Sequence, residues 1–323
     1  MGFSPCTRRR VPVAKAFGCR SVAARLKPCP DTKLAAQSHF PVAQPRALGW
    51  RLALWSLAAA PVPIAMLLGQ LYLRLAHLLA PALERRARRN LALAGIDARV
   101  MARQSRRALA RFLVVLARFA KLSRIGCSRW VRCEGWEHFH AAVERGGGVL
   151  VISGHIGHWE LGALAIGMAG HPMHLLVHRS PHREMEAYLE QLRTGSGNRL
   201  IGNLGAARAI ASLLKKNEVV TTLIDTVPSW LAADLEIPFL DGQIRTTTAL
   251  ARLVRATGAA MVPAFVLWSK VERRYVLRFE RPVELSGDEA ADTVRLFARL
   301  ERVVRENPDQ YLWIFDPGWA GAK

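Results

Sequence analysis

The chain has 323 residues, with 46 Lys and Arg against 25 Asp and Glu, and a formal net charge of +21. A charge excess of this size favours an anionic partner, which is either nucleic acid or a membrane surface. Hydrophobic residues make up 51% and nine tryptophans accompany the arginines. This composition favours the membrane, because no zinc finger, aromatic RNA-binding strand or helix-turn-helix pattern stands out. The five cysteines are odd in number and lack metal-ligand spacing, which favours a reducing compartment over a disulfide framework.

Residues 1–45 are interpreted as a flexible basic arm. They contain Arg8-Arg9-Arg10, scattered prolines and little hydrophobic periodicity. No apolar core of sufficient length follows the arginines, so the segment does not have the pattern of a signal peptide. A lipid-contacting tail and an extension without a role are both open interpretations.

Residues 46–125 are predicted to form a membrane-associating helical region. The stretch Leu52–Leu73 carries no charge and has the length of a membrane span, but Pro61 and Pro63 interrupt it. We therefore expect two short helices, 47–60 and 63–80, lying on or dipping into the cytoplasmic leaflet. A buried helical hairpin in a soluble protein is the alternative. A basic amphipathic helix is expected to follow over 97–122.

Residues 126–319 alternate short apolar runs with helical patterns, which predicts an α/β domain. The expected strands are 148–153, 174–178, 199–202, 219–225, 235–240, 260–267 and 275–281. The expected helices are 136–145, 158–169, 182–195, 205–216, 246–257 and 288–306.

The most informative stretch of this domain predicts a strand, a glycine turn and a helix. A buried strand ends at Ser153, and Gly154 and Gly157 then surround His155. His155 is therefore expected at the carboxyl end of a strand, where open α/β sheets place their sites. A carboxylate bonded to one imidazole nitrogen would make the other a general base, and Glu160 is the nearest candidate.

The spacing restricts how His155 and Glu160 can meet. Five residues turn an ideal helix by about 500°, so the two side chains meet only if His155 precedes the helix. A purely structural ion pair remains open at this point. Zinc binding by His155, His158 and Glu160 is disfavoured, because no further ligand cluster is evident.

The residues Gly154-His155-Ile156-Gly157-His158-Trp159-Glu160 resemble the His-x4-Asp/Glu box of the glycerolipid acyltransferase superfamily, and specifically that of the lipid A biosynthesis (late) acyltransferases. Further matches follow in the family's order across most of residues 47–313. They are Arg88-Arg89-Asn90-Leu91, His178-Arg179 with the helix to Leu192-Arg193, Leu223-Ile224-Asp225, and Ile237 to Gly242 with Thr246 to Thr248.

The resemblance implies an α/β fold with a mixed central sheet flanked by helices. It implies a membrane-bound O-acyltransferase that moves a fatty acyl chain from an acyl carrier protein or coenzyme A thioester to a hydroxyl of a lipid A precursor or related glycolipid. Beyond this co-substrate, neither a cofactor nor a metal is expected, and neither is a nucleic-acid partner. The expected location is the inner membrane, with the active site facing the cytoplasm and its anionic surface.

The resemblance also implies roles for individual residues. His155 would be the general base and Glu160 would orient it. Arg179 would contact a phosphate of donor or acceptor. Asp225, together with Gly154 and His158, is expected to contribute to substrate binding.

The chain departs from the family pattern in two places. His158 stands where the family often has asparagine, and Trp313 to Trp319 replace the usual His-Arg-Arg-Trp ending. The second change removes a cationic cluster that would face phosphate. A phospholipid or other glycolipid acceptor is therefore an alternative. A non-catalytic lipid-binding protein of the same fold and a soluble nucleic-acid-binding protein are further alternatives.

Overall fold

The computed structural model describes residues 45–119, 122, 127–128, 130–178, 183–202, 205–227 and 233–320. The expected N-terminal arm, apart from its last residue, lies outside the described residues. Arg179 lies outside them as well.

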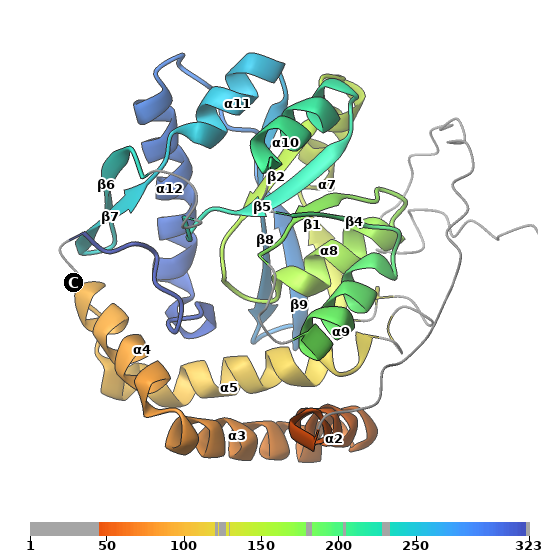
Figure 1. Ribbon diagram of the computed structural model, residues 1–323, viewed down its shortest axis with the longest axis vertical. Coiled ribbons are helices and arrows are strands. Elements are labelled where there is room, and N and C mark those ends of the chain that lie inside the picture. Colours follow the sequence, from red (N-terminus) through yellow and green to blue (C-terminus); the bar gives the residue numbers. More distant parts are fainter. Residues whose placement is uncertain are drawn as a thin grey trace, which may run out of the picture.

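Seven strands form one mixed sheet in the order β1-β9-β8-β2-β5-β3-β4 (Figure 1). Strands β8, β2, β5, β3 and β4 are parallel to one another, and β9 and β1 run in the opposite direction. The bounds are β1 Val131–Glu134, β2 Val149–Ser153, β3 His174–Leu176, β4 Arg199–Ile201, β5 Val219–Leu223, β8 Ala260–Ser269 and β9 Arg274–Phe279. A separate hairpin pairs β6 (Leu235–Phe239) with β7 (Gly242–Thr246).

Helices cover both faces of the sheet. The first face carries α7 (Trp136–Glu144), α8 (Trp159–Met168) and α9 (Arg183–Thr194), and the second carries α10 (Ala206–Lys215), α11 (Ala249–Thr257) and α12 (Glu289–Glu306). Alternate residues of β2 enter the two cores, since Val151 packs toward α8 and Ile152 toward α12. Burial on both faces explains the continuous apolar run of this strand.

The predicted α/β class with a mixed sheet is confirmed, and the seven predicted strands and six predicted helices of this domain all occur within a few residues of the expected bounds. Two strands were not predicted. β1 has four residues with polar Arg132 and Glu134 among them, and β7 alternates with polar Gln243 and Arg245. Short strands of this composition give a weak hydrophobic signal.

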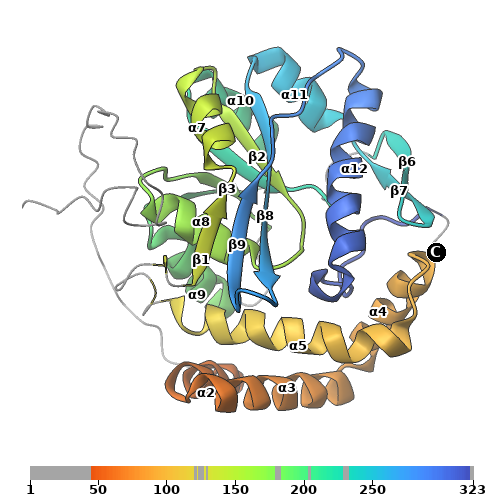
Figure 2. The same cartoon turned by 180° about the vertical axis from the view of Figure 1, so that it is seen from behind.

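Three N-terminal helices form a layer across one end of the α/β domain (Figures 1 and 2). Helices α2 (Pro45–Ala59) and α3 (Val62–Leu79) lie along α5 (Ala98–Leu116). The break at Pro61 confirms two helices in place of one continuous helix. The buried Arg118 guanidinium donates to the carbonyls of Leu57 and Ala60, and so satisfies acceptors at the broken end of α2.

Helix α3 presents apolar side chains to solvent. It is long and apolar enough to cross a membrane by length and composition, and only 11% of it is buried. Leu67 is 67% exposed, and Leu78 and Leu79 are exposed still further. A buried hairpin of a soluble protein would show the opposite pattern, because its leucines would face a core.

Helix α4 (Pro81–Leu93), which was not predicted as a helix, holds the C-terminal segment in place. Asn90 on this helix is 2% exposed. Its Nδ2 donates to the carbonyls of Trp313 and Phe315 at 2.7 and 2.6 Å, and its Oδ1 accepts from Trp319 Nε1 at 3.1 Å. One buried amide thus fixes the path of residues 313–319.

His158 is a core residue in this fold. It is fully buried, and its ring stacks on Phe112 with a centroid separation of 4.1 Å. Its Nδ1 accepts the amide of Leu161, which makes His158 the N-cap of α8. Burial lowers the pKa of this imidazole to about 3, so it remains neutral in the folded protein.

This burial predicts a pH-dependent stability. Between pH about 6.5 and about 3 the unfolded chain binds a proton at His158 that the folded chain excludes, so stability falls as the pH falls through this window. At pH 5 the loss is about 2 kcal/mol. Thermal unfolding in detergent between pH 7 and pH 5 measures it. His158→Asn is the control and should show a shallower pH dependence; an equal slope in both proteins would contradict the prediction.

Candidate active site

His155 and Asp225 meet because of the sheet topology. Strands β2 and β5 are parallel neighbours, and Ser153 at the end of one pairs with Leu223 at the end of the other. His155 and Asp225 each follow two residues later. His155 Nδ1 lies 2.9 Å from Asp225 Oδ1, and the His155 amide donates to Asp225 Oδ2 at 2.7 Å. A single carboxylate therefore holds both the ring and the backbone of the histidine.

The electrostatics keep this carboxylate ionised. Burial acts to raise the pKa of Asp225, but the nearby His155 and its two hydrogen bonds hold that pKa below its ordinary value. An ionised carboxylate only accepts, so Nδ1 donates to it, and Nε2 is the acceptor nitrogen of the neutral imidazole. His155 Nε2 makes no hydrogen bond to any part of the chain that the structure describes. The arrangement is therefore suited to accepting a proton at Nε2.

The buried phenol of Tyr311 lies beside Asp225. Burial, together with the charge of Asp225, raises the pKa of this phenol well above its ordinary value, so it stays protonated. Its interaction with the carboxylate also helps to lower the pKa of Asp225. Tyr311 thus adds a neutral polar group to an otherwise apolar surrounding.

The expected contact between Glu160 and His155 is not formed. Glu160 instead binds Arg193 of α9: Arg193 Nη2 lies 2.6 Å from Oε1, and Nε lies 3.1 Å from each oxygen. Both side chains are largely buried. The physical reason for the correction is that Asp225 already occupies Nδ1 of His155, while Glu160 turns toward α9 from the first turn of α8.

Close packing sets the glycine turn around His155. A Cβ on Gly154 would lie 2.7 Å from Leu300 Cδ1 of α12 and 3.2 Å from Asp225 Oδ2. Gly157 has a φ of +64°, and a Cβ there would lie 1.8 Å from the carbonyl oxygen of Val266. Both glycines are therefore required by the approach of neighbouring elements.

The amides of this turn are mostly engaged within the protein. The four amides from His155 to His158 donate to Asp225 Oδ2 and to the carbonyls of Gly154, Gln310 and Val266, respectively. Gly154 shapes the backbone for these contacts, and its expected role in substrate binding remains a prediction. A substrate oxygen would have to find its donors elsewhere.

His155 opens into a large apolar cavity. The cavity volume is about 1090 Å³, at the upper end of the range for small-molecule sites. It lies between the carboxyl ends of the strands and the N-terminal helices, with Leu57 of α2 and Leu116 of α5 in its wall. Its titratable groups include His155, Glu160 and Arg193, and several threonines add hydroxyl groups to the wall. This shape and polarity fit a long aliphatic chain with a reactive group at His155.

The C-terminal segment closes one side of His155. The ring of Phe315 lies 4.2 Å from the imidazole between centroids, and Trp159 stands edge-on at 5.1 Å. The position of Phe315 follows from the Asn90 hydrogen bonds to the same segment. The segment Trp313 to Trp319, which stands where the family usually has His-Arg-Arg-Trp, thus packs the aromatic ring of Phe315 against the His155 imidazole.

The other expected site residues have different outcomes. His158 does not line the cavity, because it is buried in the core, so direct substrate contact is not possible in this arrangement. Arg179 lies outside the described residues, and the neighbouring His178 lines the cavity. The partnership of Asp225 with His155 was missed, although adjacency of two parallel strands was a signal that could have found it. Within the described residues, no three His, Cys, Asp or Glu side chains converge on a metal site.

Comparisons with known proteins identify the family of the chain. Residues 47–317 match the family of bacterial lipid A biosynthesis acyltransferases. The chain is 28% identical over 274 residues to the lipid A biosynthesis palmitoleoyltransferase of Escherichia coli (strain K12), covering 81% of this chain and 87% of that protein. The same figures hold for a lipid A biosynthesis acyltransferase of Shigella flexneri.

A second Escherichia coli (strain K12) protein, the lipid A biosynthesis lauroyltransferase, is 27% identical over 199 residues, which are 58% of this chain and 61% of that protein. The family match covers most of the chain and includes every residue of the site described above. The chain belongs to the bacterial lipid A biosynthesis acyltransferase family.

Proposed function

We propose that the protein transfers a fatty acyl chain from an acyl carrier protein or coenzyme A thioester to a hydroxyl of a lipid A precursor or related glycolipid. One observation carries the proposal: the buried Asp225 carboxylate holds His155 Nδ1, while Nε2 is left unbonded beside a large apolar cavity. Family membership supports the acyl transfer, and the Escherichia coli relatives are named for transfer of palmitoleoyl and lauroyl chains.

In the proposed reaction His155 Nε2 takes the proton of the acceptor hydroxyl as its oxygen attacks the thioester carbonyl. The resulting tetrahedral intermediate expels the thiolate, which takes the proton from the imidazolium. An ester bond forms, the carbon–sulfur bond breaks, and the histidine returns to its starting state. Asp225 stabilises the imidazolium in between. A thioester is already activated, so a base and an oxyanion site are sufficient.

The oxyanion of the intermediate needs hydrogen-bond donors. The amides from His155 to His158 are already engaged, so we assign this role to the next two, those of Trp159 and Glu160. They belong to the first turn of α8, where amides have no acceptor within the helix. The positive end of the helix dipole favours a negative charge at this position.

The acyl chain of the donor is proposed to lie in the apolar cavity. Its walls come from the N-terminal helices and from strands and helices of the α/β domain, and His155 is one of the lining residues. Phe315 and Trp159 pack on the imidazole, and an acyl chain in the cavity would displace water from it. Exclusion of water favours transfer to the lipid hydroxyl over hydrolysis of the thioester.

Glu160 has a different role in this proposal from the one expected. It positions Arg193, whose Nη1 is buried and has no hydrogen-bond partner among the described residues. Arg193 lines the cavity and can donate to an anionic or carbonyl group of the substrate. Arg179 retains its proposed phosphate contact from the resemblance of its segment.

The protein is proposed to act at the inner membrane with its site toward the cytoplasm. The exposed leucines of α3 offer an apolar surface to lipid. Arginines on the neighbouring α4 and α5 can meet anionic headgroups, each contributing about 1 kcal/mol. The substrate would then enter from the bilayer side.

Acyl transfer from labelled acyl carrier protein and coenzyme A thioesters to a panel of glycolipids and phospholipids tests the proposal. His155→Ala should lower kcat by about 10² to 10⁴, and Asp225→Asn by at least about 10², because each removes part of the base. His140→Ala, away from the cavity, is the matched control. Losses of only a few-fold in both variants would overturn the mechanism, and transfer to phospholipid alone would overturn the acceptor.

A separate prediction concerns the ion pair of Glu160 and Arg193. Glu160→Gln leaves a buried cation without its partner and should destabilise the fold by about 3–5 kcal/mol. Glu160→Gln combined with Arg193→Gln removes both charges and should recover part of this loss. Thermal unfolding of the two single variants and the double variant measures the coupling. Simple addition of the two single losses would show that the pair is not coupled.

A further inference from the structure

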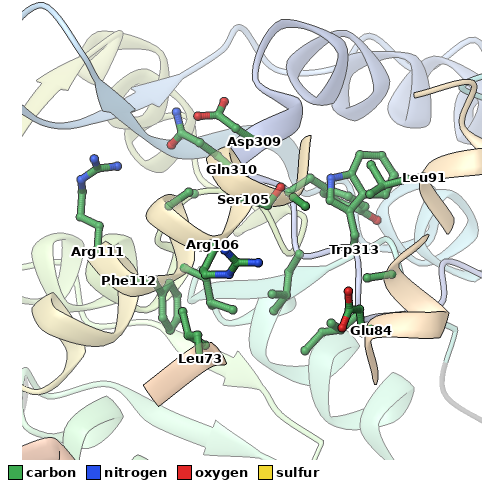
Figure 3. Close-up of a pocket in the computed structure, with 18 of the residues that line it drawn as sticks. Leu73, Glu84, Leu91, Ser105, Arg106, Arg111, Phe112, Asp309, Gln310 and Trp313 are labelled. Carbon is green, nitrogen blue, oxygen red and sulfur yellow. The ribbon is translucent and has the colours of Figure 1, made fainter. Parts of the chain in front are cut away.

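A second, smaller hollow lies beside the large cavity, and we call it the headgroup groove. It is bounded by α4, α5 and the segment 309–314 (Figure 3). Its cavity volume is about 100 Å³, enough for a group several times the size of a water molecule, which needs about 10–15 Å³. Nothing in the mechanism above uses this groove.

The groove contains two buried donors without partners. Arg106 Nε and Ser105 Oγ are both inaccessible, and neither has a hydrogen-bond partner among the described residues. Figure 3 shows Arg106 in the middle of the groove, with Ser105 close to it on the same helix. A buried donor that lacks an acceptor costs about 1–3 kcal/mol, so two adjacent ones indicate a ligand that supplies acceptors.

The charges of the groove favour an anion. Glu84 is already paired with Arg88 at 2.5 Å, and Asp309 lies 3.5 Å from Lys270. Both acidic groups of the wall are thus occupied. Arg106 has no ion-pair partner in the described part of the chain, and it leaves a positive excess in the groove.

A second cation lines the same groove. The guanidinium of Arg111 lies 4.1 Å from the centre of the Trp268 ring, and this stacking fixes its position. Arg106, with the Ser105 hydroxyl beside it, suits a phosphate, which offers several acceptor oxygens to planar, bidentate donors, and Arg111 adds a second positive charge on the same helix.

The headgroup groove adjoins the catalytic cavity. Phe112, Trp159, Leu312 and Ile314 line both. The amide of Leu312 donates to the carbonyl of His155 at 2.9 Å, so the dividing segment is attached to the histidine itself. Leu73 of the exposed apolar helix α3 also lines the groove. A lipid could therefore keep its chains toward the bilayer while its headgroup lies next to His155.

We propose that the headgroup groove binds a phosphate group of the acceptor lipid, with Arg106 and Ser105 as its ligands and Arg111 as a supporting cation. This inference rests on the proposed acyl transfer, because the phosphate positions the acceptor hydroxyl at His155. The groove also offers a local replacement for the cationic cluster missing from the chain's end.

The test compares a phosphorylated glycolipid acceptor with the same lipid after phosphatase treatment. Arg106→Gln should raise the KM for the phosphorylated acceptor about tenfold to a hundredfold, with little change in kcat, and should leave the KM for the dephosphorylated acceptor unchanged. Arg208→Gln, an exposed arginine of α10 that lines neither cavity, is the matched control. Equal effects of Arg106→Gln on both acceptors, or none, would overturn the proposal.

A binding measurement separates this inference from the proposed reaction. Retention of the two glycolipids in detergent micelles by the wild type and by Arg106→Gln needs no turnover. Selective loss of the phosphorylated glycolipid in the variant supports the groove even if no transfer occurs. Binding to phosphatidylglycerol vesicles distinguishes the sources of phosphate, because a loss confined to vesicles would overturn the assignment to the acceptor.

Two further variants keep the test decisive if Arg106→Gln destabilises the fold. Arg106→Lys keeps the charge but not the planar fork, and it should give a smaller loss of the phosphorylated acceptor than Arg106→Gln. Ser105→Ala should give a loss of about several-fold through one hydrogen bond. If Arg106→Gln lowers the melting temperature, these two variants decide the outcome, and unchanged affinity in both would overturn the proposal.

Discussion

The buried carboxylate of Asp225 is the constraint on which the site depends. It accepts from both the imidazole and the backbone amide of His155, and so fixes the tautomer and the position of the residue together. This is possible only because β2 and β5 are parallel neighbours in matching register and because Gly154 lets Leu300 and the carboxylate come close. The cavity, the Phe315 ring and the N-terminus of α8 are arranged around this pair.

Much of the fold could be predicted from the chain because its strands are buried on both faces. Runs such as Val149–Ser153 have only one interpretation once glycines bound them, and the break at Pro61 separates two helices by simple sterics. Short or polar elements were missed. Helix α4 carries four arginines among its thirteen residues, and its Asn90 contacts a segment more than 220 residues away, which no local pattern records.

The candidate site was predicted in part, for a related reason. His155 was placed correctly at the end of a strand, because strand and glycine turn are local features. Its carboxylate partner was assigned to Glu160 by proximity in the chain, whereas the fold supplies Asp225 from the next strand and turns Glu160 to Arg193. His158 is similar: its place in a motif suggested substrate contact, yet its side chain caps α8 within the core. In both cases, contacts between residues far apart in the chain determine where the side chain lies.

The central claim is that the His155–Asp225 pair stands where an acyl chain and a lipid hydroxyl meet. A structure of the full chain with an unreactive acyl thioester analogue tests this most directly. The account predicts the acyl chain in the large cavity, the carbonyl carbon near His155 Nε2 and its oxygen toward the amides of Trp159 and Glu160. An analogue bound with its carbonyl away from His155, or an acyl chain outside the cavity, would contradict it.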